Sequence, residues 1–403
     1  MKNSELSYEL GLKIIKEKHE QISEILTENN IDCWITFVRE TEVQSDPILP
    51  FIVGGDVVWD SAFIFSNVKG YQKTAIVGNF DVDAEKDKNI WDNVIGYTEG
   101  ISKELYSYIK NLNPNKIAIN YSLDDVSADG LTYGMYLKIK KYLGEFSDKL
   151  TSSEKIIKSL RGRKSKIELN LIKDACILTE EINNRMTDII KENQTEISIQ
   201  NQFHQLCDSS KVITSWQRKS CPAIDAGPDK SFGHVGPTQI ATKKGNTLHN
   251  DFGIKLKGYS SDLQRMWFFG TKEEVPTELR HAFDTVKGAI RKASEQIRPG
   301  KKGVEIDKIA RDYVKSQGYE EYQHGLGHQV GRATHDGGTL LAPLWERYGN
   351  SPQGIIEKDN VFTLELYVKT KNFGMVSLEE MIVVTEDGCN FIVPPVEDFI
   401  YIT

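Results

Sequence analysis

The chain has 403 residues, 39% of them hydrophobic, and is therefore long enough for two or three domains with packed cores. A net charge of −8 argues against a nucleic-acid-binding protein, which needs clustered basic surface. Five scattered cysteines without a Cys-x-x-Cys pair, no signal peptide and no run of eighteen apolar residues favour a cytoplasmic protein with neither a disulfide framework nor a membrane span.

The first part of the chain alternates between helical and strand patterns. Helices are predicted at residues 7–29 and 101–112, and strands at residues 31–38, 61–67, 73–80 and 116–120. Strands that alternate with helices predict a mixed α/β domain. The apolar segment 47–60 is interpreted as a buried loop, or else as a mobile lip that presents Trp59 to a cleft.

The composition turns polar and basic around residues 151–166, and we place a domain boundary there, with one domain over residues 1–157 and a second over residues 158–403. The second domain begins with a long helical pattern over residues 166–190 and a helix capped by Thr195. Helices are also predicted at 277–297 and 303–317, and strands at 361–368 and 375–384. His19, His204 and His281 lie in polar helical patterns and are interpreted as surface residues.

Two aspartates stand out in the segment 249–270. If this segment is a hairpin that turns at residues 255–258, Asp251 and Asp262 face each other with Cβ atoms about 4.5 to 5.5 Å apart. Like charges so placed are destabilising, and a divalent cation would offset the repulsion. The alternatives are an exposed hairpin with scattered acids, or a register shifted by one residue, which sends the two side chains to opposite faces.

A second acidic pair is predicted near the C-terminal end. If the last two predicted strands pair about a turn centred on Asn372, Glu365 faces Glu379 among apolar neighbours. A carboxylate in such surroundings is rarely buried without a partner. Moving the pairing by one residue replaces Glu379 by Glu380, so strand alternation alone leaves this choice open.

The histidines form the third element of the pattern. In the HGLGH segment, His324 and His328 are four residues apart, but the glycines between them favour a strand or loop over a helix, with the backbone close to a metal, a substrate or a tight turn. Four carboxylates and an imidazole are enough for two divalent ions with bridging carboxylates, and the oxygen-rich donors suit manganese. Such a pair activates water for attack on a carbonyl group. His234, considered alone, is best explained as a loop histidine with satisfied hydrogen bonds. His249 precedes Asp251 by two residues and should share its face, although a packing role is an equal alternative.

With these residues identified, the segment from about residue 158 to 395 resembles the metallopeptidase family that includes aminopeptidase P and prolidase. Creatinase and methionine aminopeptidase share its "pita-bread" fold. The resemblance lies in D-F-G followed eleven residues later by S-D, an arginine three residues further on, H-G-L-G-H, H-D and two separated glutamates. It implies a creatinase-like α/β N-terminal domain and an α+β pita-bread catalytic domain.

The resemblance also implies the metal ligands. Asp251 corresponds to a ligand of one metal, and His328 and Glu365 correspond to ligands of the other. Asp262 and Glu379 correspond to bridging ligands, which favours the first of the two consecutive glutamates. Two divalent ions are implied, with Mn²⁺ favoured and Co²⁺, Zn²⁺ or Fe²⁺ as alternatives.

Catalytic roles follow from the same resemblance. Glu365 corresponds to the general base or proton shuttle. His234, His324 and His335 resemble the second-sphere histidines that contact the scissile carbonyl and the amine side of the substrate, and His234 and His335 are therefore also expected to bind substrate.

Three positions depart from the family pattern. Leu366 replaces a usual proline. Ser377 replaces an arginine that helps to neutralise the carboxylates and, in prolidase-like members, anchors a dipeptide carboxylate. Arg332 stands at a position that is usually apolar and is a candidate substitute anchor for substrate, although a surface arginine is an equal alternative.

The resemblance implies hydrolysis of the peptide bond that precedes proline in short peptides, by attack of a metal-bridging hydroxide. The enzyme would be an Xaa-Pro aminopeptidase or an Xaa-Pro dipeptidase, and the N-terminal domain would form a homodimer and narrow the cleft. Two alternatives are a creatinase-like hydrolase that cleaves a non-peptide C–N bond without metal and a pita-bread binding protein without catalytic activity.

Overall fold

The computed structural model describes residues 3–228 and 236–403. The chain divides into two compact units, Ser7–Arg161 and Gly162–Thr403, and the second unit also includes the N-terminal segment Met1–Leu6. The predicted boundary after residue 157 lies within helix α6 (Glu154–Gly162), four residues before this division. Within the basic stretch at the boundary, Arg161 and Lys164 are buried, whereas Lys166 is exposed.

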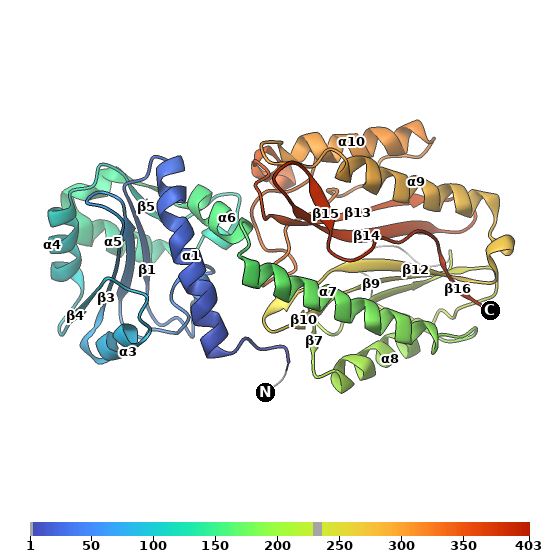
Figure 1. Cartoon of the computed structure of the whole chain (residues 1–403), viewed down its shortest axis with the longest axis horizontal. Helices are drawn as coiled ribbons and strands as arrows, with labels where there is room; N and C mark the ends of the chain where they lie inside the picture. Colours follow the sequence, from blue (N-terminus) through green and yellow to red (C-terminus); the bar gives the residue numbers. More distant parts are fainter. Residues whose placement is uncertain (1–2, 229–235) are drawn as a thin grey trace. The chain divides into compact units, whose positions relative to one another are not determined.

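The unit Ser7–Arg161 is a mixed α/β domain built on one sheet with the strand order β4-β3-β2-β1-β5-β6 (Figure 1). Its strands are β1 (Cys33–Val38), β2 (Ser61–Ser66), β3 (Gln72–Gly78), β4 (Asn93–Tyr97), β5 (Ile117–Ile119) and β6 (Leu150–Ser152). Its helices are α1 (Tyr8–Glu28), α2 (Leu49–Ile52), α3 (Val82–Asp87), α4 (Ser102–Leu112), α5 (Tyr133–Leu143) and α6. The predicted helices and strands of this half are confirmed, with small shifts at their ends.

Side-chain alternation along β1 explains why helices cover both faces of this sheet. Trp34 packs in one hydrophobic cluster with residues of α1 and α2, whereas Ile35 packs in the other with residues of α4 and α5. In the segment 47–60, the part that contains α2 is mostly buried, whereas residues 55, 56, 58 and 59 are exposed, so the interpretation as a buried loop fits only the first half, and that half is helical. Trp59 in the same segment is 53% exposed.

The second unit has a larger sheet with the order β13-β14-β12-β9-β8, to which β15 and β16 add beside β14 and β12. The strands are β7 (Ile213–Thr214), β8 (Ala223–Ala226), β9 (Thr247–Phe252), β10 (Ile254–Leu256), β11 (Tyr259–Ser260), β12 (Leu263–Phe269), β13 (Val361–Lys369), β14 (Met375–Val384), β15 (Cys389–Phe391) and β16 (Ile400–Ile402). Strands β11, β10 and β7 form a smaller sheet.

Two helix pairs cover the larger sheet (Figure 1). They are α7 (Lys166–Thr187) with α8 (Glu196–Ser209), and α9 (Thr277–Ser294) with α10 (Gly303–Ser316). The first pair packs with residues of β8, β9 and β12, and the second packs on β13 and β14. Ser165 begins α7 through a capping box with Glu168, and Thr195 caps α8 as predicted. This α+β arrangement leaves the central strands to hold the polar site.

Candidate metal centre

Four of the polar side chains lie in one row across four neighbouring strands. Asp251 of β9 is paired with Gln264 of β12, Gln264 with Glu379 of β14, and Glu379 with Glu365 of β13. Residues that are directly paired in this way project from the same face of a sheet. The direct pairing of Glu365 with Glu379 is the one predicted from the sequence.

The expected pairing of Asp251 with Asp262 is wrong by two residues, since Asp251 faces Gln264. The cause is the turn, which consists of Lys257 and Gly258 alone, with φ values of 47° and 80°. Positive φ at both positions is the geometry of a two-residue type I′ hairpin. A shift of two residues preserves the face of the strand. Burial and, after it, the charge of Asp251 raise the pKa of Asp262.

The HGLGH segment is irregular and extended, and it runs beside β13, which excludes the helical alternative. The backbone N–H of Glu365 donates to Leu326 O at 2.7 Å, and that of Thr363 donates to His328 O at 2.9 Å. A Cβ atom at Gly327 would lie 1.9 Å from Thr363 O. Contact between two backbone segments, rather than a ligand, therefore explains this glycine.

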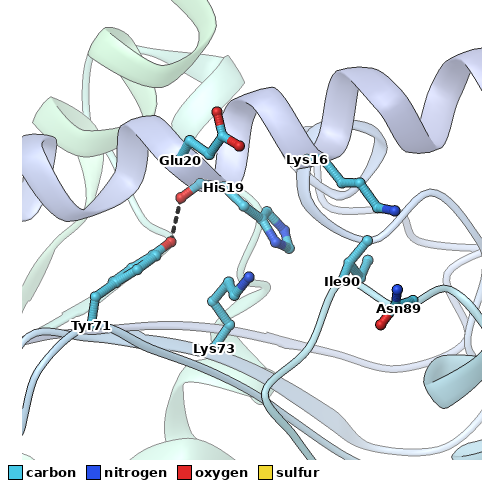
Figure 2. A pocket seen from close by; sticks show the side chains of 7 residues that line it. All are labelled: Lys16, His19, Glu20, Tyr71, Lys73, Asn89 and Ile90. Atoms are coloured by element: carbon cyan, nitrogen blue, oxygen red, sulfur yellow. Dashed lines mark hydrogen bonds between the residues drawn. The ribbon is translucent and has the colours of Figure 1, made fainter.

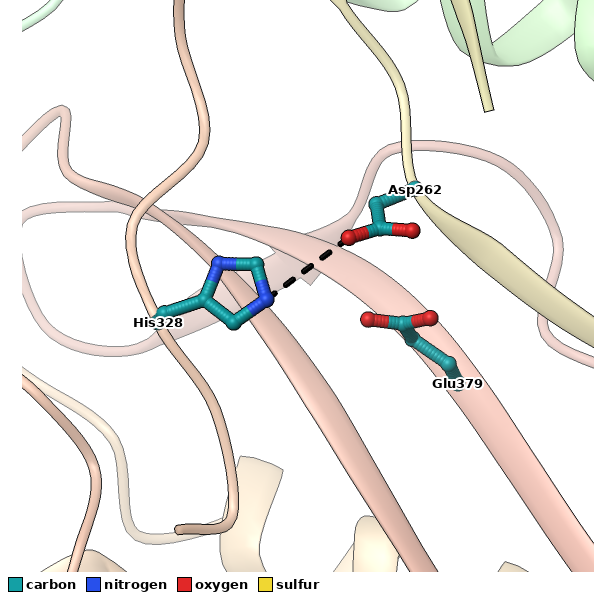
Figure 3. Close-up of side chains that lie close together, drawn as sticks. All are labelled: Asp262, His328 and Glu379. Carbon is teal, nitrogen blue, oxygen red and sulfur yellow. Dashed lines mark ion pairs between the residues drawn. The ribbon is translucent and has the colours of Figure 1, made fainter. Parts of the chain in front are cut away.

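His328, Asp262 and Glu379 face one another, each with one candidate ligand atom within 4.8 Å of the others (Figure 3). His328 Nε2 lies 3.6 Å from Asp262 Oδ2 and 3.5 Å from Glu365 Oε1. His328 Nδ1 lies 3.3 Å from Gln329 O, which can only accept, so a proton on Nδ1 would satisfy this contact. Nε2 faces the carboxylates, and the tautomer with its proton on Nδ1 is the one that a metal ligand needs.

The charges of this cluster are costly without a cation. Burial, followed by the charge of Asp251, raises the pKa of Asp262 well above its ordinary value, and burial and Asp262 do the same for Glu379. Burial raises the pKa of Glu365 to about 8 and lowers that of His328 to about 3. Among the described residues, Asp262 Oδ1 and both carboxylate oxygens of Glu379 have no hydrogen-bond partner. The donor set therefore fits a divalent cation.

Glu380 points away from this cluster. Its Oε2 lies 3.2 Å from Arg265 Nη2, and its Oε1 accepts from the backbone N–H of Val396 at 2.7 Å. Arg265 is almost completely buried and also donates to the backbone carbonyls of Gln264 and Glu379 at 2.8 and 2.9 Å. The arginine therefore holds together the two strands that carry Gln264 and Glu379.

The other predicted site residues differ in their placement. His324 is half-buried, with Nδ1 2.7 Å from Gly325 O and its ring centroid 5.4 Å from that of Tyr367. The ring of His335 packs edge-on against His328 with centroids 4.3 Å apart. The Arg332 Nε donates to Tyr259 Oη at 3.3 Å. His234 lies outside the described residues.

A polar network beside the row was not predicted. Asp225 Oδ2 lies 2.9 Å from His249 Nδ1, and His249 Nε2 lies 3.0 Å from Gln264 Oε1. Ser377 Oγ donates to Gln264 Oε1 at 2.5 Å, and Gln264 Nε2 donates to Glu365 Oε2 at 3.3 Å. Burial lowers the pKa of His249, but the hydrogen bond and charge of Asp225 outweigh it and raise that pKa overall. In the sequence, the two-residue spacing from Asp262 to Gln264 was the signal that Gln264 lies on the same face as the carboxylates.

A cavity of about 270 Å³ lies in the unit Ser7–Arg161 (Figure 2). Lys16, Tyr71 and Lys73 are among its lining residues, together with His19. The interpretation of His19 as a surface residue is wrong, because its side chain is buried with Nε2 2.9 Å from Ile52 O. Neither the carboxylates nor His328 line this cavity, so it is separate from the candidate metal centre.

Comparison with known proteins gives consistent results. A 382-residue match to the Xaa-Pro dipeptidase of Pyrococcus furiosus is 24% identical and covers 93% of this chain and 97% of the relative. The structure of an Xaa-Pro dipeptidase from Bacillus anthracis superposes with a TM-score of 0.70 at 21% identity, covering 96% of this chain and 99% of the other. An X-Pro aminopeptidase structure from Thermotoga maritima gives 0.67 at 18% identity, covering 92% and 98%.

The structural likeness shows that the fold of this chain is the pita-bread fold with its N-terminal α/β domain. Within residues 3–228 and 236–403, no helix is both long enough and apolar enough to cross a membrane. The sequence model of metallopeptidase family M24 matches residues 170–386, more than half of the chain and all of the strands that carry the carboxylate row. The chain therefore belongs to metallopeptidase family M24.

Proposed function

We propose that the protein is a metal-dependent exopeptidase that hydrolyses the bond before proline in short peptides, as an Xaa-Pro aminopeptidase or an Xaa-Pro dipeptidase. The main support is the buried cluster in which carboxylate oxygens without hydrogen-bond partners among the described residues lie beside His328. The Xaa-Pro specificity is suggested by the names of the relatives from Pyrococcus furiosus and Bacillus anthracis.

The proposed ligands are Asp251, Asp262, His328, Glu365 and Glu379. Their oxygen-rich donor set suits two Mn²⁺ ions, with Asp262 and Glu379 as the bridging carboxylates. When bound, the ions would supply a water activated at neutral pH and would stabilise negative charge on the carbonyl oxygen.

Glu365 is the proposed proton shuttle. In the metal-free protein burial raises its pKa to about 8, and bound divalent cations would lower it again, so the carboxylate would be ionised and able to accept a proton. Its Oε2 is held by Gln264 and its Oε1 faces His328, so the carboxyl group has a fixed orientation.

The second-sphere histidines have proposed roles at the substrate. Nδ1 of His324 must carry a proton, because Gly325 O accepts from it, and burial lowers the pKa of His324 to about 4. Its Nε2 is therefore an acceptor, suited to an N–H group of the substrate. His335, which packs against His328, is proposed to contact the substrate as well. The same role is proposed for His234.

Arg332 is proposed as an anchor for the C-terminal carboxylate of a short substrate. Its guanidinium group lies over the Tyr259 ring at 5.6 Å, and Tyr259 Oη donates to Glu168 Oε1 at 3.0 Å. An Arg332→Ala variant should raise KM for Xaa-Pro dipeptides more than for longer Xaa-Pro peptides. Equal effects on both substrates would remove this assignment.

The N-terminal α/β domain is proposed to form a cytoplasmic homodimer and to restrict the cleft to short peptides. Sedimentation equilibrium at micromolar concentration tests the proposal, and a monomeric mass would refute it.

The decisive experiment combines metal analysis of the purified protein with a peptide panel. Xaa-Pro dipeptides and longer Xaa-Pro-Yaa peptides are incubated with protein that is chelated and then reloaded with Mn²⁺. Activity should require metal and should disappear in Asp262→Asn and Glu365→Gln. Full activity of the chelated variants would overturn the proposal, and cleavage of a non-peptide C–N bond without metal would favour the creatinase-like alternative.

A further inference from the structure

Gln264 occupies the centre of the carboxylate row and is itself neutral. It is paired with Asp251 on one side and with Glu379 on the other, and only 4% of its surface is exposed. A buried carboxamide among carboxylates is stable only in an orientation in which its oxygen accepts a hydrogen bond and its NH₂ group donates one.

Its neighbours determine that orientation. The Ser377 hydroxyl donates to Gln264 Oε1 at 2.5 Å, and His249 Nε2 lies 3.0 Å from the same oxygen. The NH₂ group then donates to Glu365 Oε2 at 3.3 Å. When Glu365 is ionised, as a metal ligand must be, the flipped carboxamide would place its oxygen against a carboxylate, which is repulsive.

Because of this contact, the two carboxylate oxygens of Glu365 have different neighbours. Gln264 donates to Oε2, whereas Oε1 lies 3.5 Å from Nε2 of His328. We infer that Gln264 is a positioning residue that holds Glu365 in the orientation in which it would bind metal beside His328, and that Ser377 acts through Gln264. The inference rests on the metal ligands of the proposed function.

The same geometry accounts for Ser377, the clearest departure from the family pattern. Ser377 is 2% exposed, and its hydroxyl lies 2.5 Å from Gln264 Oε1 and 3.2 Å from Leu366 O. It brings no charge to the carboxylates. Its hydroxyl fixes the carboxamide that in turn aligns Glu365.

A double-mutant cycle tests the inference, with Mn²⁺ binding to the metal-free full-length protein measured by calorimetry. Gln264→Met removes both ends of the carboxamide at similar size and should weaken Mn²⁺ binding about 10- to 100-fold, as for other residues that orient metal ligands. Ser377→Ala should weaken it about 2- to 10-fold, the usual effect of one hydrogen bond. The double variant should match Gln264→Met within about twofold, because Ser377 acts through Gln264.

Ser260→Ala is the matched control, because Ser260 is also a fully buried serine and its Oγ has no hydrogen-bond partner among the described residues. It should leave Mn²⁺ affinity unchanged. Near-ultraviolet circular dichroism establishes that each variant is folded. If Gln264→Met does not fold, Ser377→Ala decides alone, and parent-like affinity in that variant overturns the inference.

Unchanged Mn²⁺ affinity in folded Gln264→Met, or additive effects in the double variant, would also overturn the inference. A parent protein that binds no Mn²⁺ overturns it together with the metal assignment. A parent that binds Mn²⁺ but cleaves no Xaa-Pro peptide refutes the proposed activity alone, because the binding cycle is independent of turnover.

Discussion

Replacing Glu379 by Gln should stabilise the metal-free protein. Candidate ligand oxygens of Glu379 and Asp262 lie within 4.8 Å of each other, and both side chains are buried. Two unit charges at that distance repel by about 3.5 kcal/mol at an effective dielectric constant of about 20. Because partial protonation already relieves some of this repulsion, we expect a gain of about 2 kcal/mol in the free energy of unfolding.

The gain should depend on pH. Burial raises the pKa values of Glu365 and Glu379, so the folded metal-free state binds more protons than the unfolded state. For an acid with a raised folded pKa, stability falls as pH rises from the unfolded value near 4.5. For Glu365 this loss extends through about pH 8. The Glu379→Gln variant removes one such group, so its advantage should be larger at pH 8 than at pH 5.

Urea denaturation of chelated protein at the two pH values measures both effects. Glu320→Gln, which changes an exposed glutamate, is the control and should have little effect. With saturating Mn²⁺ the order should reverse, because the parent keeps all its ligands and binding to the folded state adds about 2.7 kcal/mol at 100 times Kd. A metal-free Glu379→Gln protein less stable than the parent at pH 8 would refute the electrostatic reasoning.

Three further predictions concern the supports of the site and the N-terminal unit. Lys164 and Asp336 form an ion pair of 2.9 Å with both side chains fully buried, so Lys164→Ala should cost about 3 to 5 kcal/mol in urea denaturation. Gly327→Ala should cost about 1 to 3 kcal/mol and weaken Mn²⁺ binding, because the added Cβ would lie 1.9 Å from Thr363 O. Burial lowers the pKa of His19 to about 4, so its contribution to stability should be lost as pH falls from about 6.5 to 4, and His19→Phe should remove this acid sensitivity.

Each of these predictions has a distinct contrary outcome. A Lys164→Ala protein as stable as the parent would show that Asp336 is accommodated without its cation. Parent-like Mn²⁺ affinity in Gly327→Ala would show that the position of the HGLGH backbone does not affect metal binding. Gly134→Ala is the control, because its Cβ would meet open space. Equal acid sensitivity of the parent and His19→Phe would exclude His19 as the titrating group.

The sequence was sufficient to predict the strand pairing of the second acidic hairpin. Glu365 and Glu379 are equidistant from Asn372, and the strands pair about that centre. The choice between Glu379 and Glu380 needed more than alternation, and the resemblance to a family pointed to the first. The structure gives the physical reason, because Glu380 is paired with buried Arg265.

The first hairpin was less predictable because its register depends on turn conformation. Both a four-residue turn and a two-residue Lys257-Gly258 turn are compatible with the local sequence, and they differ by two residues in pairing. The error had little effect on the site because an even shift preserves the face of a strand. His19 was missed for another reason: its helix is polar in pattern, and only tertiary packing buries it.

The polar network could not be derived from the types of its residues, but its location follows from the pleat of the sheet. His249 precedes Asp251 by two residues, and Ser377 precedes Glu379 by two, so both lie on the face of the carboxylate row. Gln264 lies in that row and joins the network to Glu365. Ser377 and Gln264 are thus one hydrogen-bonded unit, and a serine in place of arginine does not indicate a degenerate site when a carboxamide opposite uses its hydroxyl.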